Sequence, residues 1–92
     1  MEQFKPKVDQ ILKDRIRIVK EMARQEVVSV QLNPKMSLEQ KSESLKGKRE
    51  DAITGAKASG LSDLEIEEVV RAFDVEVHLL TEELNQDQEL AA

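Results

Sequence analysis

Apolar residues recur at helical spacing along most of the chain, which predicts three helices joined by two short turns. Between residues 7 and 28 they cover about half of a helix circumference, more than a simple two-stranded coiled coil requires. We therefore expect a first helix near 7–30 that contacts two neighbours. The β-branched run 26–34 also suits a short strand, but no second strand is evident to pair with it, so we interpret it as the end of this helix.

A second helix is predicted near 37–59. Asn33 and Pro34 end the first helix, and Ser37 with Gln40 has the form of a capping box. Gly47 and Gly55 each cost about 1 kcal/mol relative to alanine in a helix, so this helix is expected to be the weakest. Two explanations stay open: the glycines permit close approach of a neighbour, or the segment becomes ordered only with a partner. Its apolar residues are Leu38, Leu45, Ala52, Ile53 and Ala56.

The third helix, near 62–88, has the clearest start signal. Gly60 suits the left-handed position that ends a helix, Ser62 with Glu65 forms a second capping box, and Leu61 with Ile66 forms a hydrophobic staple. The helix carries apolar residues at alternating intervals of four and three, which is typical of a seam covered by another helix. This predicted seam consists of Ile66, Val70, Phe73, Val77, Leu80 and Leu84.

A second, weaker apolar patch is expected on nearly the opposite side of the third helix, at Ala72, Val75 and Leu79. Scattered apolar surface residues are normal on any protein, and a dimer or partner contact is the alternative explanation. We include both the seam and this patch among the candidate partner or dimer contacts.

Length and composition limit the chain to one small helical domain, residues 1–92, with frayed ends at 1–5 and 86–92. There are two phenylalanines and no tryptophan or tyrosine, so the core must be aliphatic. Because a core of this size buries little surface, dimerisation is favoured. The predicted fold is all-α, a three-helix antiparallel bundle with long first and third helices.

The charge of the chain is divided between its two ends. Residues 1–57 carry a net charge of +4 and residues 58–92 carry −9, which gives −5 in total. Packing of the two parts would bring opposite charges together. We expect Lys41, Lys48 and Arg49 of the second helix to face the acidic residues of the third and to set the pairing direction.

On the first helix, four cations at intervals of four, three and four form a basic stripe: Lys13, Arg17, Lys20 and Arg24. Such a row can follow a phosphate backbone, whereas an ordinary solvated helix face is the simpler explanation. Asp9 and Glu21 are placed to pair with part of it. The lack of tyrosine and tryptophan and the acidic composition also count against nucleic acid.

No group of residues has the spacing of a catalytic or metal site. Asp74, His78 and Glu82 share one helix face but form a thin ligand set, and cysteine is absent. We expect no enzyme, no cofactor, no metal, no small-molecule substrate and no membrane association. The N-terminal residues lack the apolar region of a secretory signal, which favours a cytoplasmic protein. The predicted function is a protein-interaction or regulatory module acting by helix–helix association as a homodimer, and nucleic-acid binding through the basic stripe is the alternative.

Overall fold

The computed structural model describes the backbone of residues 4–91 and the side chains of residues 10–86. Within these ranges the chain forms three helices and no strand: α1 (Phe4–Gln31), α2 (Leu38–Ala58) and α3 (Asp63–Ala91). The all-α prediction is confirmed, and the β-branched run at 26–34 belongs to α1 as far as Gln31. Residues 1–3 and 92 lie outside the described residues, so the fraying expected at both ends falls partly on them.

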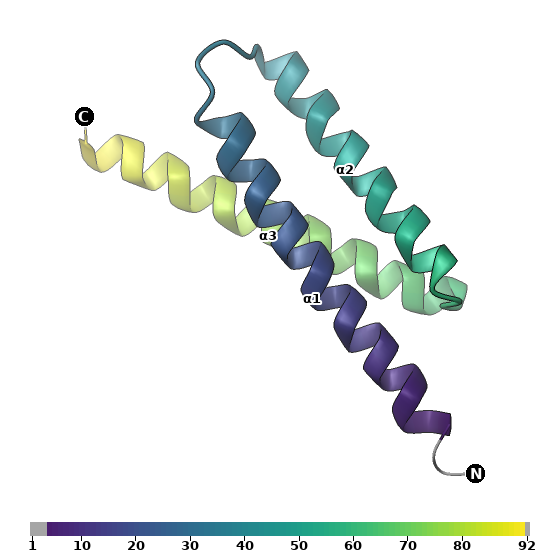
Figure 1. The fold of residues 1–92 in the computed structure, drawn as a ribbon. Coiled ribbons are helices and arrows are strands. Elements are labelled where there is room, and N and C mark those ends of the chain that lie inside the picture. Colours follow the sequence, from purple (N-terminus) through teal and green to yellow (C-terminus); the bar gives the residue numbers. More distant parts are fainter. Residues whose placement is uncertain (1–3, 92) are drawn as a thin grey trace.

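Each helix packs against the other two, and α1 and α3 make the most extensive contact. α2 runs antiparallel to both, so α1 and α3 point the same way and cross near their middles (Figure 1). The N-terminal half of α1 and the C-terminal half of α3 extend past this crossing at opposite ends. The molecule is therefore elongated, with extents of 58 × 24 × 16 Å.

Both predicted capping boxes are present, which explains where α2 and α3 begin. Ser37 Oγ accepts from the Gln40 amide at 3.1 Å, and Gln40 Oε1 accepts from the Ser37 amide at 2.9 Å. Ser62 and Glu65 exchange the same two bonds at 3.3 and 2.8 Å. Each box satisfies amides that have no partner inside the helix, so the helix starts are determined by residues next to them in sequence.

Two residues after the last residue of α2 lies Gly60, whose φ of +83° is the left-handed conformation that glycine adopts without strain. The Gly60 amide donates to the Lys57 carbonyl at 3.0 Å, and the Leu61 amide donates to the Ala56 carbonyl at 3.4 Å. These two bonds define a Schellman motif, which reverses the chain and places Leu61 next to the core. Ile66 packs against the same buried cluster, as expected for a hydrophobic staple.

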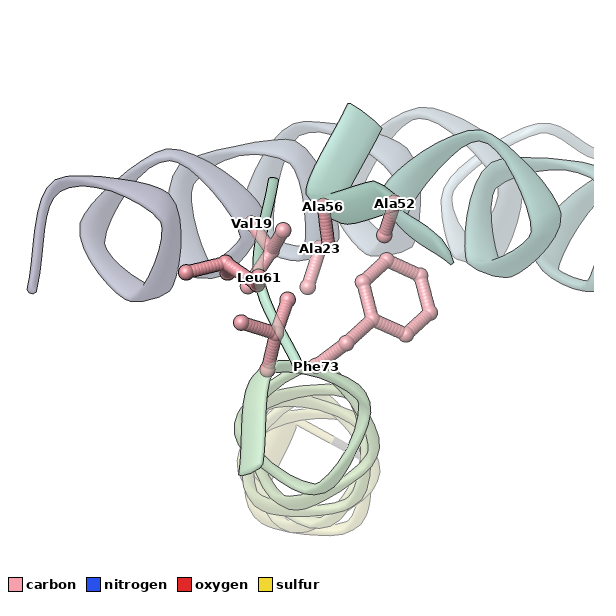
Figure 2. Close-up of a cluster of buried hydrophobic side chains, with 7 residues drawn as sticks. Val19, Ala23, Ala52, Ala56, Leu61 and Phe73 are labelled. Carbon is pink, nitrogen blue, oxygen red and sulfur yellow. The ribbon is translucent and has the colours of Figure 1, made fainter. Parts of the chain in front are cut away.

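The core lies where the three helices meet (Figure 2). α3 contributes its largest residue, Phe73, whereas α2 contributes only alanines, and the Phe73 ring extends towards Ala52. Small side chains on α2 allow its backbone to approach the other two helices closely. The buried cluster consists of Val19, Ala23, Ala52, Ala56, Leu61, Val69 and Phe73.

The contact face of α3 differs from the predicted seam. Phe73 is fully buried as expected, but its buried neighbour is Val69, which the predicted seam omits. The other five seam residues, Ile66, Val70, Val77, Leu80 and Leu84, are half-buried. Because α3 packs against two helices, its buried arc is wider than a two-stranded seam and is centred on Val69 and Phe73. None of the predicted seam residues is bare in solvent.

Gly55 and Gly47 have different surroundings, which bears on the two explanations for the glycines of α2. A Cβ atom on Gly55 would clash with the Arg15 guanidinium, whereas a Cβ atom on Gly47 would meet nothing within 4 Å. Close approach therefore accounts for Gly55, across which Arg15 packs. Gly47 has no such neighbour.

The two charged residues inside the apolar arc of α1 both lie against α2. Arg15 Nε is buried and has no hydrogen-bond partner among the described residues. Glu26 accepts a hydrogen bond from the Ser44 hydroxyl. Long side chains at such positions bury their stems while the charged group reaches a partner or the surface.

No helix in the described range combines the length and the apolar character needed to cross a membrane.

Candidate interaction surfaces

The outer face of α3 carries the exposed large apolar side chains of that helix, among the residues whose side chains are described. Leu64, Val75 and Leu79 are 75%, 49% and 56% exposed. They follow one side of the helix together with three exposed charged residues, at intervals of four, three, four, four and three. We call this set the outer strip: Leu64, Glu68, Arg71, Val75, Leu79 and Glu82.

Ala72, which the sequence places with Val75 and Leu79, does not belong to the outer strip. Its side chain is half-buried and packs against the core cluster. It lies on the flank of α3 that meets a neighbouring helix, so the predicted patch was wrong at this residue. Leu64 takes its place at the surface, and the signal in the sequence is its spacing of eleven residues, three helical turns, from Val75.

The predicted seam residues serve contacts within the chain. Ile66 and Val77 pack against the core cluster next to Phe73. Ile66 and Val70 also line a shallow groove between α2 and α3, whose wall on the α2 side includes Ile53. Leu80 and Leu84 are half-buried further along the helix. Among the described side chains of α3, the large apolar residues that remain well exposed, and thus accessible to a partner, are Leu64, Val75 and Leu79 of the outer strip.

Arg49 and Asp74 join α2 to α3 at the edge of this groove. Arg49 Nε and Nη2 donate to the two carboxylate oxygens of Asp74 at 2.9 and 3.2 Å, a bidentate ion pair. The hydrogen bond that Arg49 donates to Asp74 raises the pKa of the Arg49 guanidinium above its ordinary value. The prediction that Arg49 faces the acids of the third helix is confirmed.

The other two cations predicted to face α3 do not pair with it. Lys41 Nζ donates to the Gln31 carbonyl at 3.4 Å, which ties the start of α2 to the end of α1. Lys48 is exposed and forms no ion pair within the described side chains. The prediction was wrong for Lys41, and for Lys48 no contact with α3 is seen. Arg49 is therefore the cation of the predicted three that links the two helices.

The basic stripe of α1 borders a groove between α1 and α3. Its four cations, Lys13, Arg17, Lys20 and Arg24, line this groove together with Ile16, Glu21 and Glu76. Arg24 Nη2 lies 3.7 Å from Glu76 Oε2 on α3. Arg17 pairs with Asp14 at 3.1 Å instead of the expected Glu21. The expected partner of Lys13, Asp9, lies outside the residues whose side chains are described.

The acidic and histidine residues of α3 are not gathered into a ligand set. Asp74 of the Asp74, His78, Glu82 row is held by Arg49. Among the described residues, no three histidine, cysteine or carboxylate side chains are grouped closely enough to hold a metal ion.

Several apolar side chains outside α3 are also exposed, including Val28 at 42% and Leu32 at 56%. Val28 lies on α1 and Leu32 directly after its last residue, and neither takes part in the outer strip. They provide matched positions against which the strip can be tested.

Comparison of the chain with protein-family models, with curated proteins and with solved structures finds no match.

Proposed function

We propose that this protein is a non-enzymatic interaction or regulatory module of the cytoplasm, which acts by helix–helix association and forms a homodimer. The observation that supports it is the outer strip, where Val75 and Leu79 form an apolar centre on an accessible helix face. Burying aliphatic side chains of this size contributes about 1.5–3 kcal/mol each when they are fully removed from water. A second helix is the partner that matches a straight strip at helical spacing.

The size of the chain also supports association. A 92-residue chain buries a smaller fraction of its surface on folding than a larger domain does, so a further interface adds stability that the isolated core lacks. The core is correspondingly small, with seven buried residues in its main cluster among the side chains that the structure describes.

Sedimentation velocity over a concentration series tests the proposal. We expect the sedimentation coefficient to rise from the monomer to the dimer value, and the series should reach about 1 mM because small interfaces are weak. Circular dichroism at each concentration shows whether the monomer is already helical. A chain that stays monomeric throughout the series would contradict the proposal.

Binding of a polyanion along the basic stripe is the second candidate. It is favoured by the groove between α1 and α3, which all four stripe cations line. Row-like cation contacts to phosphates make affinity strongly dependent on salt. Two pairings within the chain, Arg24 with Glu76 and Arg17 with Asp14, already neutralise part of this charge, which is why we place it second.

Titration into labelled duplex DNA and into RNA at about 50 and 200 mM salt tests the second candidate. Binding through the stripe should be lost in Lys13→Gln/Lys20→Gln and kept in Lys46→Gln/Lys48→Gln, which removes two exposed cations from α2. No binding at the lower salt concentration would exclude this function.

A further inference from the structure

The outer strip has charges of opposite sign at the two ends of its apolar centre. Arg71 precedes Val75 by four residues, and Glu82 follows Leu79 by three. Both charged side chains are exposed, and neither forms an ion pair within the described part of the chain. From Arg71 to Glu82 the strip therefore presents a cation, two apolar residues and an anion in that order along the helix.

This order discriminates between the two ways in which identical helices can pair. In a parallel pair each residue meets its own copy, so Arg71 faces Arg71 of the partner subunit and Glu82 faces Glu82 of the partner subunit. Like charges placed opposite one another across an interface are unfavourable. In an antiparallel pair the cation of one helix meets the anion of the other on both sides of the centre.

The register follows from the spacing. When the two-fold axis passes close to position 77, between Val75 and Leu79, each Val75 lies opposite Leu79 of the partner subunit. Arg71 then lies within one residue of the level of Glu82 of the partner subunit, close enough for its long side chain to reach the carboxylate. Such a two-fold contact uses the same surface on both chains, as closed dimers do.

We propose that a second copy of the chain covers the outer strip, with the two α3 helices antiparallel and each Val75 packed against Leu79 of the partner subunit. An ion pair between Arg71 and Glu82 of the partner subunit flanks this contact on each side. The inference rests on the proposed function, because it specifies the geometry of the homodimer proposed above. The ion pairs set the direction, and the apolar centre supplies most of the affinity.

Charge reversal tests the direction. Arg71→Glu places two anions opposite each other, and Glu82→Arg places two cations opposite each other, so each variant should dimerise about tenfold more weakly than the wild type. An equimolar mixture of the two variants should form a heterodimer of about wild-type affinity. The double variant Arg71→Glu/Glu82→Arg should also recover the homodimer. A parallel dimer predicts no weakening in either single variant, which would overturn the inference.

Spin labels measure the geometry directly, and the absence of cysteine from the chain makes single-cysteine labelling straightforward. Glu67 and His78 are both exposed on α3 beside the strip, and their labels leave it intact. With the axis near position 77, the axial separation between identical residues is about 30 Å at Glu67 and about 3 Å at His78, at 1.5 Å per residue. Similar distances at the two positions would indicate parallel helices and contradict the register.

The apolar centre has matched controls. Val75→Glu and Leu79→Glu should each weaken dimerisation by about a hundredfold, because a charge replaces a side chain at the middle of the contact. Val28→Glu and Leu32→Glu alter side chains of similar exposure outside the strip and should leave dimerisation unchanged. Equal effects in both sets would overturn the inference.

The outcomes separate the two proposals. A wild-type chain that remains monomeric refutes the homodimer itself. If the wild type dimerises and the charge-reversal variants dimerise equally well, the antiparallel α3 contact is refuted and the homodimer is not. The same holds if the labels at Glu67 and His78 give similar distances.

Discussion

Helices α2 and α3 each begin with a capping box of the same kind, but they contribute different kinds of residue to the core. α3 supplies Phe73 and Val69, its fully buried large side chains, whereas α2 supplies Ala52 and Ala56. Gly55 of α2 lies directly against Arg15 of α1. The comparison indicates two ways of building one core: α3 fills volume, and α2 contributes by lying close to its neighbours.

Replacing Phe73 should have the largest effect, because it removes the main source of volume from α3. Phe73→Ala is expected to lower the free energy of unfolding by about 3–5 kcal/mol, measured by urea denaturation. If this variant does not fold, Phe73→Leu should lose less than about 2 kcal/mol and remain measurable. Leu38→Ala, at the exposed start of α2, is the control and should change stability by less than about 0.5 kcal/mol. Equal losses in Phe73→Ala and Leu38→Ala would contradict the assignment of the core.

Enlarging an alanine of α2 tests whether this helix needs to lie close to its neighbours. Ala56→Leu is expected to destabilise the fold by about 1–3 kcal/mol, because the added methylenes have no space at a fully buried position. The same substitution two residues later, Ala58→Leu, adds the same volume at an exposed position and should be nearly neutral. Thermal unfolding of the two variants gives the comparison. If Ala56→Leu were as stable as Ala58→Leu, the space between the helices would be larger than the structure shows.

The two helical glycines of α2 should respond differently to alanine. Gly47→Ala is expected to stabilise the protein by about 0.5–1 kcal/mol, because alanine restricts the unfolded chain and the site is open. Gly55→Ala should gain less, since the new methyl group displaces the Arg15 guanidinium. The difference between their melting temperatures measures the cost of moving Arg15. A larger gain in stability in Gly55→Ala than in Gly47→Ala would show that moving the Arg15 guanidinium costs no free energy.

The smallest effect is expected at the ion pair that joins α2 and α3. Arg49→Gln should cost about 0.2–1 kcal/mol, because the pair is exposed at the surface, and the loss should shrink at high salt. Lys48→Gln, the neighbouring cation without a partner among the described side chains, is the control. Because the bond to Asp74 raises the pKa of Arg49, the guanidinium keeps its charge until strong alkali, so raising the pH from neutrality should remove the pairing contribution only there. If Lys48→Gln lost as much stability as Arg49→Gln, the loss would be due to the change in net charge and not to this ion pair.

Much of the fold was predictable because its signals are local. The capping boxes at Ser37 and Ser62 and the left-handed Gly60 depend on contacts within a few residues, so they act wherever the helices later pack. The helical spacing of apolar residues likewise predicted three helices without reference to their partners. The pairing of Arg49 with the acids of α3 was also anticipated, from the division of charge along the chain.

Other features depended on the arrangement of the helices. The sequence predicted a seam through Val70, whereas the buried residue is Val69, because α3 contacts two helices and its buried face turns to lie between them. For the same reason Ala72 joins the core and Leu64 is left at the surface. The partner of Arg24 could not be predicted from the sequence either, since Glu76 comes within 3.7 Å of it only where α1 crosses α3.

Local signals in the sequence set where α2 and α3 begin, where α2 ends and which broad side of each helix is apolar. Which residue lies at the centre of each contact, which cations find partners and which apolar residues remain exposed depend on how the three helices pack. The physical reason is distance along the chain: caps and turns are settled within about one helical turn, whereas packing depends on the number and direction of neighbours that the chain brings together from far apart.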